Sequence, residues 1–477
     1  MVLPQIIQGG MGVGISNWRL AQAVSRRGQL GVVSGTALDQ ILARRLQDGD
    51  PGGDMRRALA QFPAPAVAVR VWDSYFIEGG KATGKAYRAM PLPSAARSPE
   101  FEELCVVANF AEVTLAREGH DGAVGINYLE KVQMPHLPSL YGAMLAGVRV
   151  VLMGAGIPTK IPGALDRLAR HESAEYPLHV TGDAPGTTTL TFTPSDVVGK
   201  GLPPLTRPAF LAIVSSDVLA KTLLRKSNGR VDGFVVEGPR AGGHSAPPRG
   251  RPELNARGEP VYGDRDRVDL DKVRELGRPY WLAGGWGTPE RLAEALAGGA
   301  AGVQVGSAFA LCAESGLRGD YRRALLDEAL RGAVRVFNDP HASPTGFPFK
   351  VAALEGTLSE DAVYAARPRI CDLGYLREAY READGSLAFR CPSEPVSVYV
   401  SKGGAEPETL GRKCVCNALI ANAGHAQTRA GRHVEPGLVT IGEDLSAIPR
   451  FVTPGSADYT AADVIAVLMS APAAVPA

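Results

Sequence analysis

The sequence predicts an α/β fold, a (β/α)8 TIM barrel with an insertion after its second strand and an α-rich C-terminal extension. Eight short apolar segments in residues 1–310 mostly alternate with helical segments, an order that indicates a parallel sheet with helices outside it. Eight such units favour closure into a barrel over an open sheet. An open dinucleotide-binding sheet is the weaker interpretation, because Gly10-x-Gly12-x-Gly14 after the first strand does not have the GxGxxG spacing.

Composition and charge exclude several classes of protein. The chain has 477 residues, of which 45% are hydrophobic and 21% charged, so it can bury a large core. With 51 Lys and Arg against 50 Asp and Glu, the net charge is +1, and no basic excess indicates nucleic acid or an anionic membrane surface. The N-terminus MVLPQIIQGGMG does not resemble a signal peptide, and no apolar run is long enough to span a membrane. The six cysteines are few for this length, so we expect a cytoplasmic protein.

The predicted strands are short and stop at glycine or polar residues. Gln5-Ile6-Ile7 stops at a glycine pair, and Phe234-Val235-Val236 has the composition of a strand that is buried on both faces. The eight strands are expected at residues 5–7, 30–34, 122–128, 148–153, 210–215, 234–236, 280–283 and 302–305.

Cap residues and apolar periodicity place the helices between these strands. Asn17 is expected to cap the first helix, and Gly28 follows its end. Thr288 and Pro289 are the expected N-cap and first residue of the helix before the last strand. The other helices of the barrel are expected at 140–146, 161–171 and 217–226.

Four segments depart from the simple alternation. Residues 38–120 are longer than one crossover requires and are predicted to be an insertion over part of the barrel, with helices at 38–46, 54–61 and 101–118 and an extended piece at 66–72. Residues 179–192 are predicted to form a hairpin. Residues 246–267 are rich in Pro, Arg and Gly, and we expect a mobile loop over the active site. Residues 311–477 are expected to pack on the barrel as a helical and irregular region, with helices near 321–334 and 461–469.

Small and polar residues gather at the predicted carboxyl ends of the strands, where barrels of this kind place their chemistry. Glycine there lets a flat or charged ligand approach the backbone, because no Cβ stands in the way. His244, which follows a double glycine, adds a group that titrates near neutral pH. The residues concerned are Gly9, Gly10, Met11, Asn127, Glu237, Gly242, Gly243, His244, Gly284, Gly285, Gly306 and Ser307.

The last two strand ends predict a phosphate pocket. Glycine turns after the seventh and eighth strands, with a short helix after the eighth, point backbone N–H groups at an anion. Ser307 can add a hydroxyl donor. A phosphate site together with a flat surface beside Met11 suggests flavin mononucleotide (FMN) as the cofactor.

The motifs QGGMG, GINYLE, VVEGPRAGGH, LAGGWG, GVQVGSAFAL and ASPTGFPFK together resemble the nitronate monooxygenase family, formerly called 2-nitropropane dioxygenases. These are FMN-dependent TIM barrels related to flavin-dependent enoyl reductases. The resemblance implies that Asn127 and Gly242 bind FMN and that His244 transfers a proton from the substrate. It also implies that Gly284, Gly285 and the segment Gln304, Val305, Gly306 and Ser307 hold the phosphate.

One residue departs from this family pattern. The sixth strand usually ends in glutamine in the family, whereas here it ends in Glu237. A carboxylate facing the flavin disfavours the anionic reduced ring, unless the carboxyl is protonated or paired. This departure puts reactivity in question more than cofactor binding.

The expected reaction follows from these roles. A nitronate would sit over the flavin with His244 as general acid or base, and O2 would complete denitrification to a carbonyl compound and nitrite. The alternative is an NAD(P)H-dependent enoyl reductase acting on an enoyl thioester in fatty-acid or polyketide synthesis. A second alternative is a flavin- or metal-binding accessory protein without turnover. A homodimer is possible, and neither nucleic acid nor a membrane is an expected partner.

Other titratable residues carry weaker hypotheses. Cys371, Cys391, Cys414 and Cys416 could hold zinc or an iron–sulfur cluster, but no CxxC pair is present and buried free thiols are the simpler interpretation. His341, Lys160 and Lys350 are candidates to approach the site. The remaining histidines considered, His120, His136, His171 and His179, are expected at the surface or as capping residues.

Overall fold

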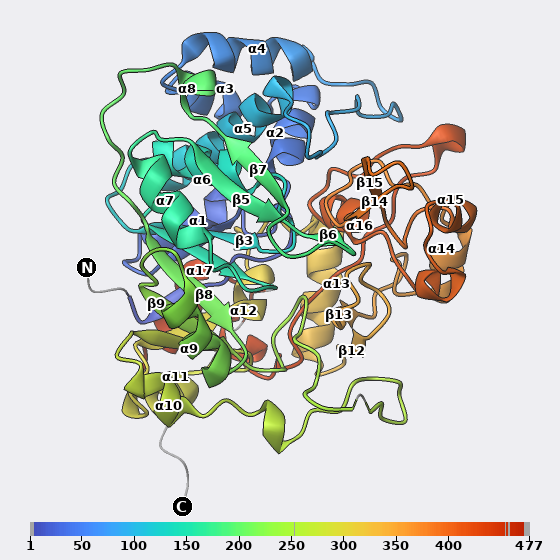
Figure 1. Cartoon of the computed structure of the whole chain (residues 1–477). Coiled ribbons are helices and arrows are strands. Elements are labelled where there is room, and N and C mark those ends of the chain that lie inside the picture. The colour runs from blue at the N-terminus through green and yellow to red at the C-terminus, as the bar shows by residue number, and fades with distance from the viewer. Residues whose placement is uncertain (1–3, 252, 454, 457, 472–477) are drawn as a thin grey trace, which may run out of the picture.

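Eight parallel strands form a closed barrel in the computed structural model, which describes residues 4–251, 253–453, 455–456 and 458–471 (Figure 1). The strand order is β1-β11-β10-β9-β8-β4-β3-β2. The two ends of this order meet, because the backbone N–H of Gln8 donates to the Leu30 carbonyl at 2.9 Å and that of Leu30 donates to the Ile6 carbonyl at 3.1 Å. The prediction of a TIM barrel is therefore confirmed. The strands are β1 (Ile6–Gln8), β2 (Gly31–Ser34), β3 (Val124–Leu129), β4 (Val150–Gly154), β8 (Ala209–Val214), β9 (Gly233–Glu237), β10 (Tyr280–Ala283) and β11 (Gly302–Val305).

Side chains fill the interior of the barrel, as expected for a barrel that is closed by eight strands. The interior cluster consists of Ile7, Leu30, Val32, Val150, Leu152, Leu211, Val235, Trp281 and Ala283. Trp281 is fully buried, and its indole Nε1 donates to the Pro4 carbonyl at 3.0 Å. Because Pro4 precedes β1, this bond ties the amino-terminal end of the barrel to its core.

The helices of the barrel form where cap residues and apolar periodicity predict them. The Asn17 side chain accepts from the Leu20 N–H at 2.9 Å at the start of α1, and Thr288 accepts from the Arg291 N–H at 3.2 Å at the start of α11. The helices are α1 (Trp18–Ser25), α6 (His136–Leu145), α7 (Ile161–Ala169), α9 (Asp217–Lys226), α10 (Leu270–Glu275), α11 (Pro289–Ala297) and α12 (Ser307–Ala310), with the 3-10 helix η1 (Asp264–Asp266) before α10.

The insertion after β2 consists of α2 (Leu38–Gln47), α3 (Asp54–Leu59), α4 (Pro65–Tyr75) and α5 (Pro99–Arg117). The predicted extended piece at 66–72 is wrong, because these residues belong to α4. Val67, Ala68, Val71 and Tyr75 are its buried residues, which is helical spacing, and Pro65 starts it. The helix α5 packs on both α1 and α6, so it takes the place of a barrel helix, and α2 to α4 lie outside it at the top of Figure 1.

The hairpin after α7 is present but starts earlier than predicted. Its strands are β5 (Ala174–Leu178) and β7 (Thr188–Phe192), which pair antiparallel, and α8 (Ser195–Val198) follows. Between them, β6 (Val180–Thr181) pairs with β14 of the C-terminal region. The prediction missed β5 because its sequence, AEYPL, contains a glutamate and a proline that weaken the strand pattern.

The C-terminal region contains two antiparallel strand pairs that the sequence did not indicate. These are β12 (Val336–Asp339) with β13 (Phe349–Ala352) and β14 (Glu378–Arg381) with β15 (Leu387–Arg390). Its helices are α13 (Gly319–Leu330), α14 (Asp361–Ala366), α15 (Val396–Ser401), α16 (Val415–Asn422) and α17 (Ala461–Leu468), with 3-10 helices η2 (Glu406–Thr409), η3 (Ala430–Arg432) and η4 (Ile448–Arg450).

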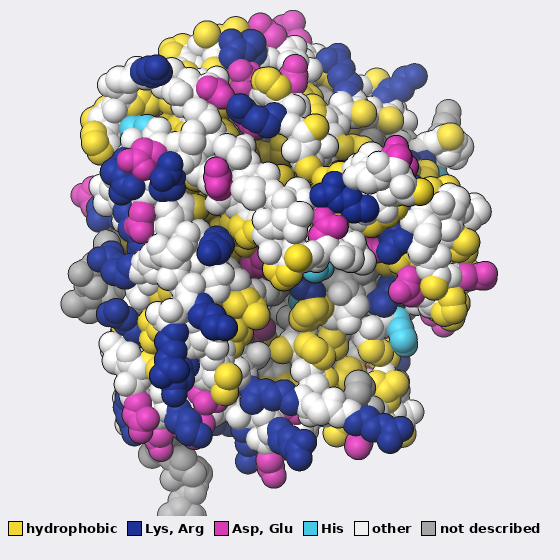
Figure 2. Space-filling view, viewed as in Figure 1, with side chains coloured by type: hydrophobic (Ala, Val, Ile, Leu, Met, Phe, Trp, Pro, Cys, Tyr) yellow, Lys and Arg dark blue, Asp and Glu magenta, His cyan; other side chains and the backbone are white. Residues whose placement is uncertain are grey.

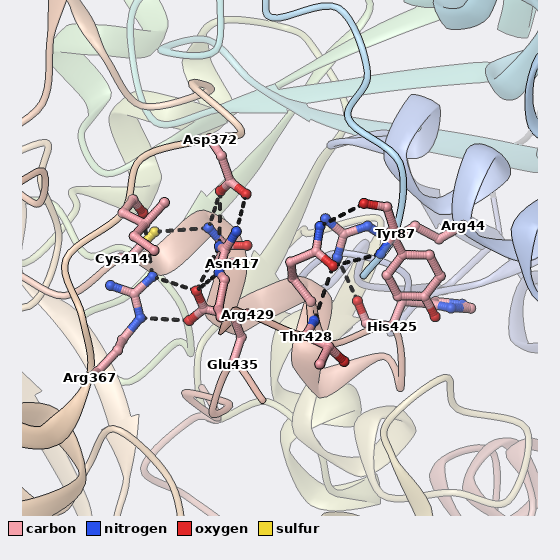
Figure 3. Close-up of polar contacts among 12 residues, drawn as sticks. Arg44, Tyr87, Arg367, Asp372, Cys414, Asn417, His425, Thr428, Arg429 and Glu435 are labelled. Atoms are coloured by element: carbon pink, nitrogen blue, oxygen red, sulfur yellow. Dashed lines mark hydrogen bonds and ion pairs between the residues drawn. The ribbon is translucent and has the colours of Figure 1, made fainter. Parts of the chain in front are cut away.

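A buried polar network fixes this region internally (Figure 3). Glu435 accepts from Arg367 Nε at 2.6 Å and from Arg429 Nε at 2.7 Å, and Arg429 Nη2 also donates to Asp372 at 3.1 Å. Nearby, Arg44 of α2 donates to the His425 carbonyl at 2.6 Å, so the same region is attached to the insertion.

On the face of the molecule that Figure 2 shows, basic and acidic side chains are interspersed, and neither kind forms a large region by itself. This distribution agrees with the net charge of +1. Among the described residues, no helix has both the length and the apolar character needed to cross a membrane.

Candidate active site

The predicted site residues come from five strand ends and line a single cavity at the carboxyl end of the barrel. The cavity brings together every residue that the sequence selected for FMN and proton transfer. Those residues are Gly9, Gly10, Met11, Asn127, Glu237, Gly242, Gly243, His244, Gly284, Gly285, Gln304, Val305, Gly306 and Ser307. The convergence follows from the parallel sheet, because all strand ends of one polarity share one rim.

Two amide side chains at this rim have buried oxygen atoms without a hydrogen-bond partner in the described part of the chain. They are Asn127 Oδ1, on β3, and Gln304 Oε1, on β11. The other end of the Asn127 amide is held, since its Nδ2 donates to the Gly10 carbonyl at 3.2 Å. A buried amide oxygen without a donor costs about 1–3 kcal/mol, so both atoms fit a ligand with hydrogen-bond donors, such as the ring N–H and the ribityl hydroxyls of a flavin.

Glycine is required at several of these positions because the backbone is crowded or left-handed. A Cβ on Gly10 would lie 2.4 Å from Cβ of Asn127, and one on Gly242 would lie 2.8 Å from the Gly442 nitrogen. Gly284 and Gly285 have φ of +87° and +88°, which L-residues with side chains rarely adopt. The predicted phosphate turn therefore exposes backbone to the cavity, and the residues present fit a phosphorylated flavin.

His244 is held as a neutral imidazole. Its Nε2 lies 2.7 Å from the Ser343 hydroxyl, and its ring meets that of Phe349 edge-on with centroids 4.8 Å apart. Burial, with a smaller contribution from the Lys131 ammonium, lowers the pKa of His244 to about 4. An imidazole that is neutral at physiological pH can accept a proton, as a general base must.

Glu237 ends β9 beside Ala283 of β10 and lines the same cavity. Burial raises the pKa of its carboxyl to about 7. The carboxyl is therefore about half protonated at neutral pH and largely protonated below it. A neutral carboxyl does not repel an anionic reduced flavin.

A segment of the C-terminal region, residues 439–445, completes the cavity, and the sequence did not predict this. Thr440 Oγ1 accepts from the Gly243 N–H at 2.7 Å, and the Gly442 N–H donates to Ser307 Oγ at 3.0 Å. The residues of this segment that line the cavity are Val439, Thr440, Ile441, Gly442, Asp444 and Leu445. No local motif in VTIGEDL could have found it, because its position depends on the path of the whole C-terminal region.

The weaker candidates do not enter the cavity. His341 and Lys160 are exposed and are not among the lining residues. Lys350 is fully buried on β13, where its ammonium pairs with the Glu443 carboxylate and its backbone N–H donates to the Gly243 carbonyl at 3.0 Å. It supports the segment around His244 from behind without lining the cavity.

The loop at 246–267 also supplies none of the lining residues in its described part, 246–251 and 253–267. Instead it packs on the edge of β12, where Glu259 accepts from the Asn338 N–H at 3.1 Å. Its role as a loop over the site stays a prediction.

The other titratable candidates take structural positions. Cys371, Cys391, Cys414 and Cys416 are free thiols, and the described residues contain no group of three or more His, Cys, Asp or Glu that could hold a metal ion. Cys391 and Cys414 are buried, in line with the interpretation as buried thiols, whereas Cys371 and Cys416 are partly exposed. The expectation of a surface position is wrong for His136, which is buried with its Nε2 2.9 Å from the Glu130 carbonyl.

Comparison with known protein families bears on this site directly. Residues 208–336, from β8 to the first residue of β12, match the family model described as nitronate monooxygenase. This stretch is similar to the nitronate monooxygenase domain. The matched residues include Glu237, Gly242, His244, Gly284, Gly285 and Ser307. The chain is an oxidoreductase enzyme. A comparison with curated proteins finds no match.

Solved structures with similar overall arrangement were also found. FabK from Thermotoga maritima is 17% identical, with 98% of this chain and 92% of that chain covered and a TM-score of 0.47. A nitroalkane oxidase from Streptomyces ansochromogenes is 16% identical, with 98% and 94% covered and a TM-score of 0.48. The enoyl reductase domain of MlnA from Bacillus amyloliquefaciens is 12% identical, with 97% and 92% covered and a TM-score of 0.43.

Proposed function

We propose that the protein is an FMN-dependent oxidoreductase of the nitronate monooxygenase type, with His244 as the proton-transfer residue. The observation that carries this proposal is the composition of one cavity. It combines two buried amide oxygens that lack donors, two left-handed glycines at the phosphate turn and a desolvated imidazole. Such a set suits a ligand that is flat at one end and anionic at the other, next to a base.

The residues divide into a cofactor set and a substrate set. Asn127 and Gln304 would accept hydrogen bonds from the ring, and Gly284, Gly285, Gly306 and Ser307 would hold the phosphate. Ser307 accepts from Gly442, so its own hydroxyl hydrogen remains free to donate to a phosphate oxygen. When bound, FMN supplies the electron transfer.

His244 would move the proton. Its neutral Nε2 or Nδ1 can take a proton from an acidic carbon next to a nitro group, and Ser343 fixes the ring orientation through the 2.7 Å contact. The ring of Phe349 covers one side of the imidazole edge-on and contributes to its desolvation.

An enoyl reductase is the second candidate, and Glu237 is the observation that favours it. Reduction of an enoyl thioester requires a proton donor, and a neutral imidazole whose pKa is about 4 is a poor one. A carboxyl whose pKa is about 7 can supply a proton at neutral pH. The NAD(P)H and thioester sites of this alternative have no separate support in the cavity.

Flavin analysis and anaerobic reduction test the proposal. The purified protein, or the protein reconstituted with FMN, is expected to show a flavin spectrum with one FMN per chain. Bleaching by an alkyl nitronate but not by NADPH supports the monooxygenase type, and rapid bleaching by NADPH supports the reductase. A protein that binds no flavin at micromolar concentration would overturn both candidates.

A further inference from the structure

Thr345 is a polar residue beside the site that the proposed reaction does not use. It lies in the segment between β12 and β13, two residues after Ser343. Its Oγ1 is 2.9 Å from Ser343 Oγ, and Ser343 Oγ is 2.7 Å from His244 Nε2. Three polar side chains therefore form a chain of contacts that begins at the proposed base and ends at a half-buried hydroxyl.

The backbone holds the two hydroxyls in this order. Ser343 Oγ accepts from the Thr345 N–H at 3.3 Å, and Thr345 Oγ1 accepts from the Phe347 N–H at 3.5 Å. These are two successive turns of the kind that serine and threonine form with the N–H group two residues ahead. Arg412 fixes the segment from another side, because its Nη1 donates to the Ser343 carbonyl at 2.6 Å. The contact with His244 is therefore made by a segment whose own geometry is fixed.

The second ring nitrogen of His244 has a different environment. His244 lines the cavity, and its Nδ1 has no hydrogen-bond partner among the described residues. Within the same part of the chain, Nδ1 is also not one of the buried polar atoms that lack a partner, so it is not sealed from the cavity. Because Ser343 occupies Nε2, Nδ1 is the nitrogen that a substrate in the cavity can reach.

The hydrogens along this chain of contacts have two possible arrangements, since a hydroxyl both donates and accepts. In the first, Nε2–H donates to Ser343 and Ser343 donates to Thr345, which leaves a lone pair on Nδ1. In the second, Thr345 donates to Ser343 and Ser343 donates to Nε2, which leaves a hydrogen on Nδ1. Only the first arrangement provides a base at the nitrogen that the substrate can reach. It also suits the imidazolium that proton transfer creates, because Nε2–H is already a donor and no hydroxyl has to turn.

We propose that Thr345 is a positioning residue, which accepts the Ser343 hydrogen and so keeps His244 in the Nε2–H tautomer with Nδ1 as the basic nitrogen. This inference rests on the proposed function, because it takes His244 as the base. In the transfer step the substrate C–H bond breaks, its electron pair stays on the substrate, and the proton bonds to the lone pair of Nδ1. The resulting imidazolium donates its Nε2–H to Ser343.

Two substitutions separate the hydroxyl of Thr345 from its shape. Thr345→Val keeps the branched shape and removes the acceptor, so the Ser343 hydrogen has only Nε2 left to bind and the Nδ1–H tautomer becomes favoured. Thr345→Ser keeps the hydroxyl and is the matched control. Because Thr345 is only half-buried, we expect both variants to fold.

The first test reads the tautomer without flavin, by nitrogen-15 NMR of the unliganded protein with labelled histidine at pH 7. The imidazole is neutral at this pH, because burial lowers the pKa of His244 to about 4. Its signals are assigned by their loss in His244→Asn. We expect hydrogen on Nε2 in wild type and in Thr345→Ser, and on Nδ1 in Thr345→Val. A wild type with hydrogen on Nδ1 would overturn the inference, and so would a Thr345→Val protein with the wild-type tautomer.

The second test is turnover of 2-nitropropane by the FMN-loaded protein. One hydrogen bond of ordinary net strength shifts a tautomer ratio roughly 2- to 10-fold, so kcat of Thr345→Val should fall by a factor in this range. KM and FMN affinity should not change, and Thr345→Ser should recover kcat. Equal kcat in wild type and Thr345→Val would count against the inference. If the tautomers are as expected but wild type turns over no nitro compound, the proposed function fails and the assignment of the tautomer stands.

Discussion

The charged network around Glu435 permits a quantitative prediction about the C-terminal region. The side chain of Glu435 is 0% exposed and that of its partner Arg367 is 4% exposed. The Glu435→Gln variant keeps the shape of the side chain, but Arg367 and Arg429 both lose its carboxylate. Arg367 has no other carboxylate partner among the described residues. Breaking a buried ion pair by removing one member costs about 3–5 kcal/mol. Because Arg429 retains Asp372, we expect a loss near the lower end, about 3 kcal/mol.

The chain offers a matched control at its surface. Glu290 accepts from Arg450 at 2.7 and 3.0 Å, in the same two-pronged geometry, but the side chains are 35% and 38% exposed. Solvent screens such a pair, so Glu290→Gln is expected to lower the free energy of unfolding much less than Glu435→Gln. The two variants therefore compare a buried carboxylate that holds two arginines with an exposed carboxylate that holds one.

Urea unfolding at pH 7, followed by circular dichroism, measures both free energies. We expect the cost of Glu435→Gln to persist in 1 M NaCl, where the effect of Glu290→Gln should vanish. The FMN affinity of Glu435→Gln should also fall, because Glu435 precedes the 439–445 segment that lines the cavity. If the losses in unfolding free energy of the two variants differ by less than about 1 kcal/mol, the buried network does not stabilise the C-terminal region as proposed.

Three further outcomes are expected. His244→Ala should retain bound FMN and lose at least about 100-fold in turnover, and undiminished turnover would leave His244 a structural role. The buried imidazole resists protonation, so the unfolded chain binds more protons between pH 6.5 and about 4. Wild type should therefore lose unfolding free energy as the pH falls through this window, and His244→Asn should lose less; equal acid profiles would show that the ring is not desolvated. Gly285→Ala, at φ +88°, should weaken FMN binding roughly 5- to 30-fold from about 1–2 kcal/mol of backbone strain. Gly277→Ala, at φ +65° in open space outside the cavity, should affect stability alone, and equal FMN affinities in the two variants would contradict the phosphate assignment.

Local pattern was sufficient for the barrel and for its rim. Short β-branched strands, Asn and Thr caps and glycines after strands are signals contained in a few consecutive residues, and parallel strands then place all their carboxyl ends together. This explains why His244, Asn127 and the glycine turns could be predicted to meet although they lie far apart in the chain. The segment at 66–72 was misassigned because its apolar residues fit a strand pattern as well as a helical one, and packing against the insertion decided between them.

The sequence by itself determined the closed parallel sheet, the glycine rim and the imidazole above it, because each of these follows from spacing along the chain. Only the tertiary structure decided that residues 439–445 form a wall of the cavity. It also decided the protonation of Glu237 and His244, whose pKa values move in opposite directions to about 7 and about 4. The physical reason is that burial removes water from a group, and the residues that remove it come from distant parts of the chain.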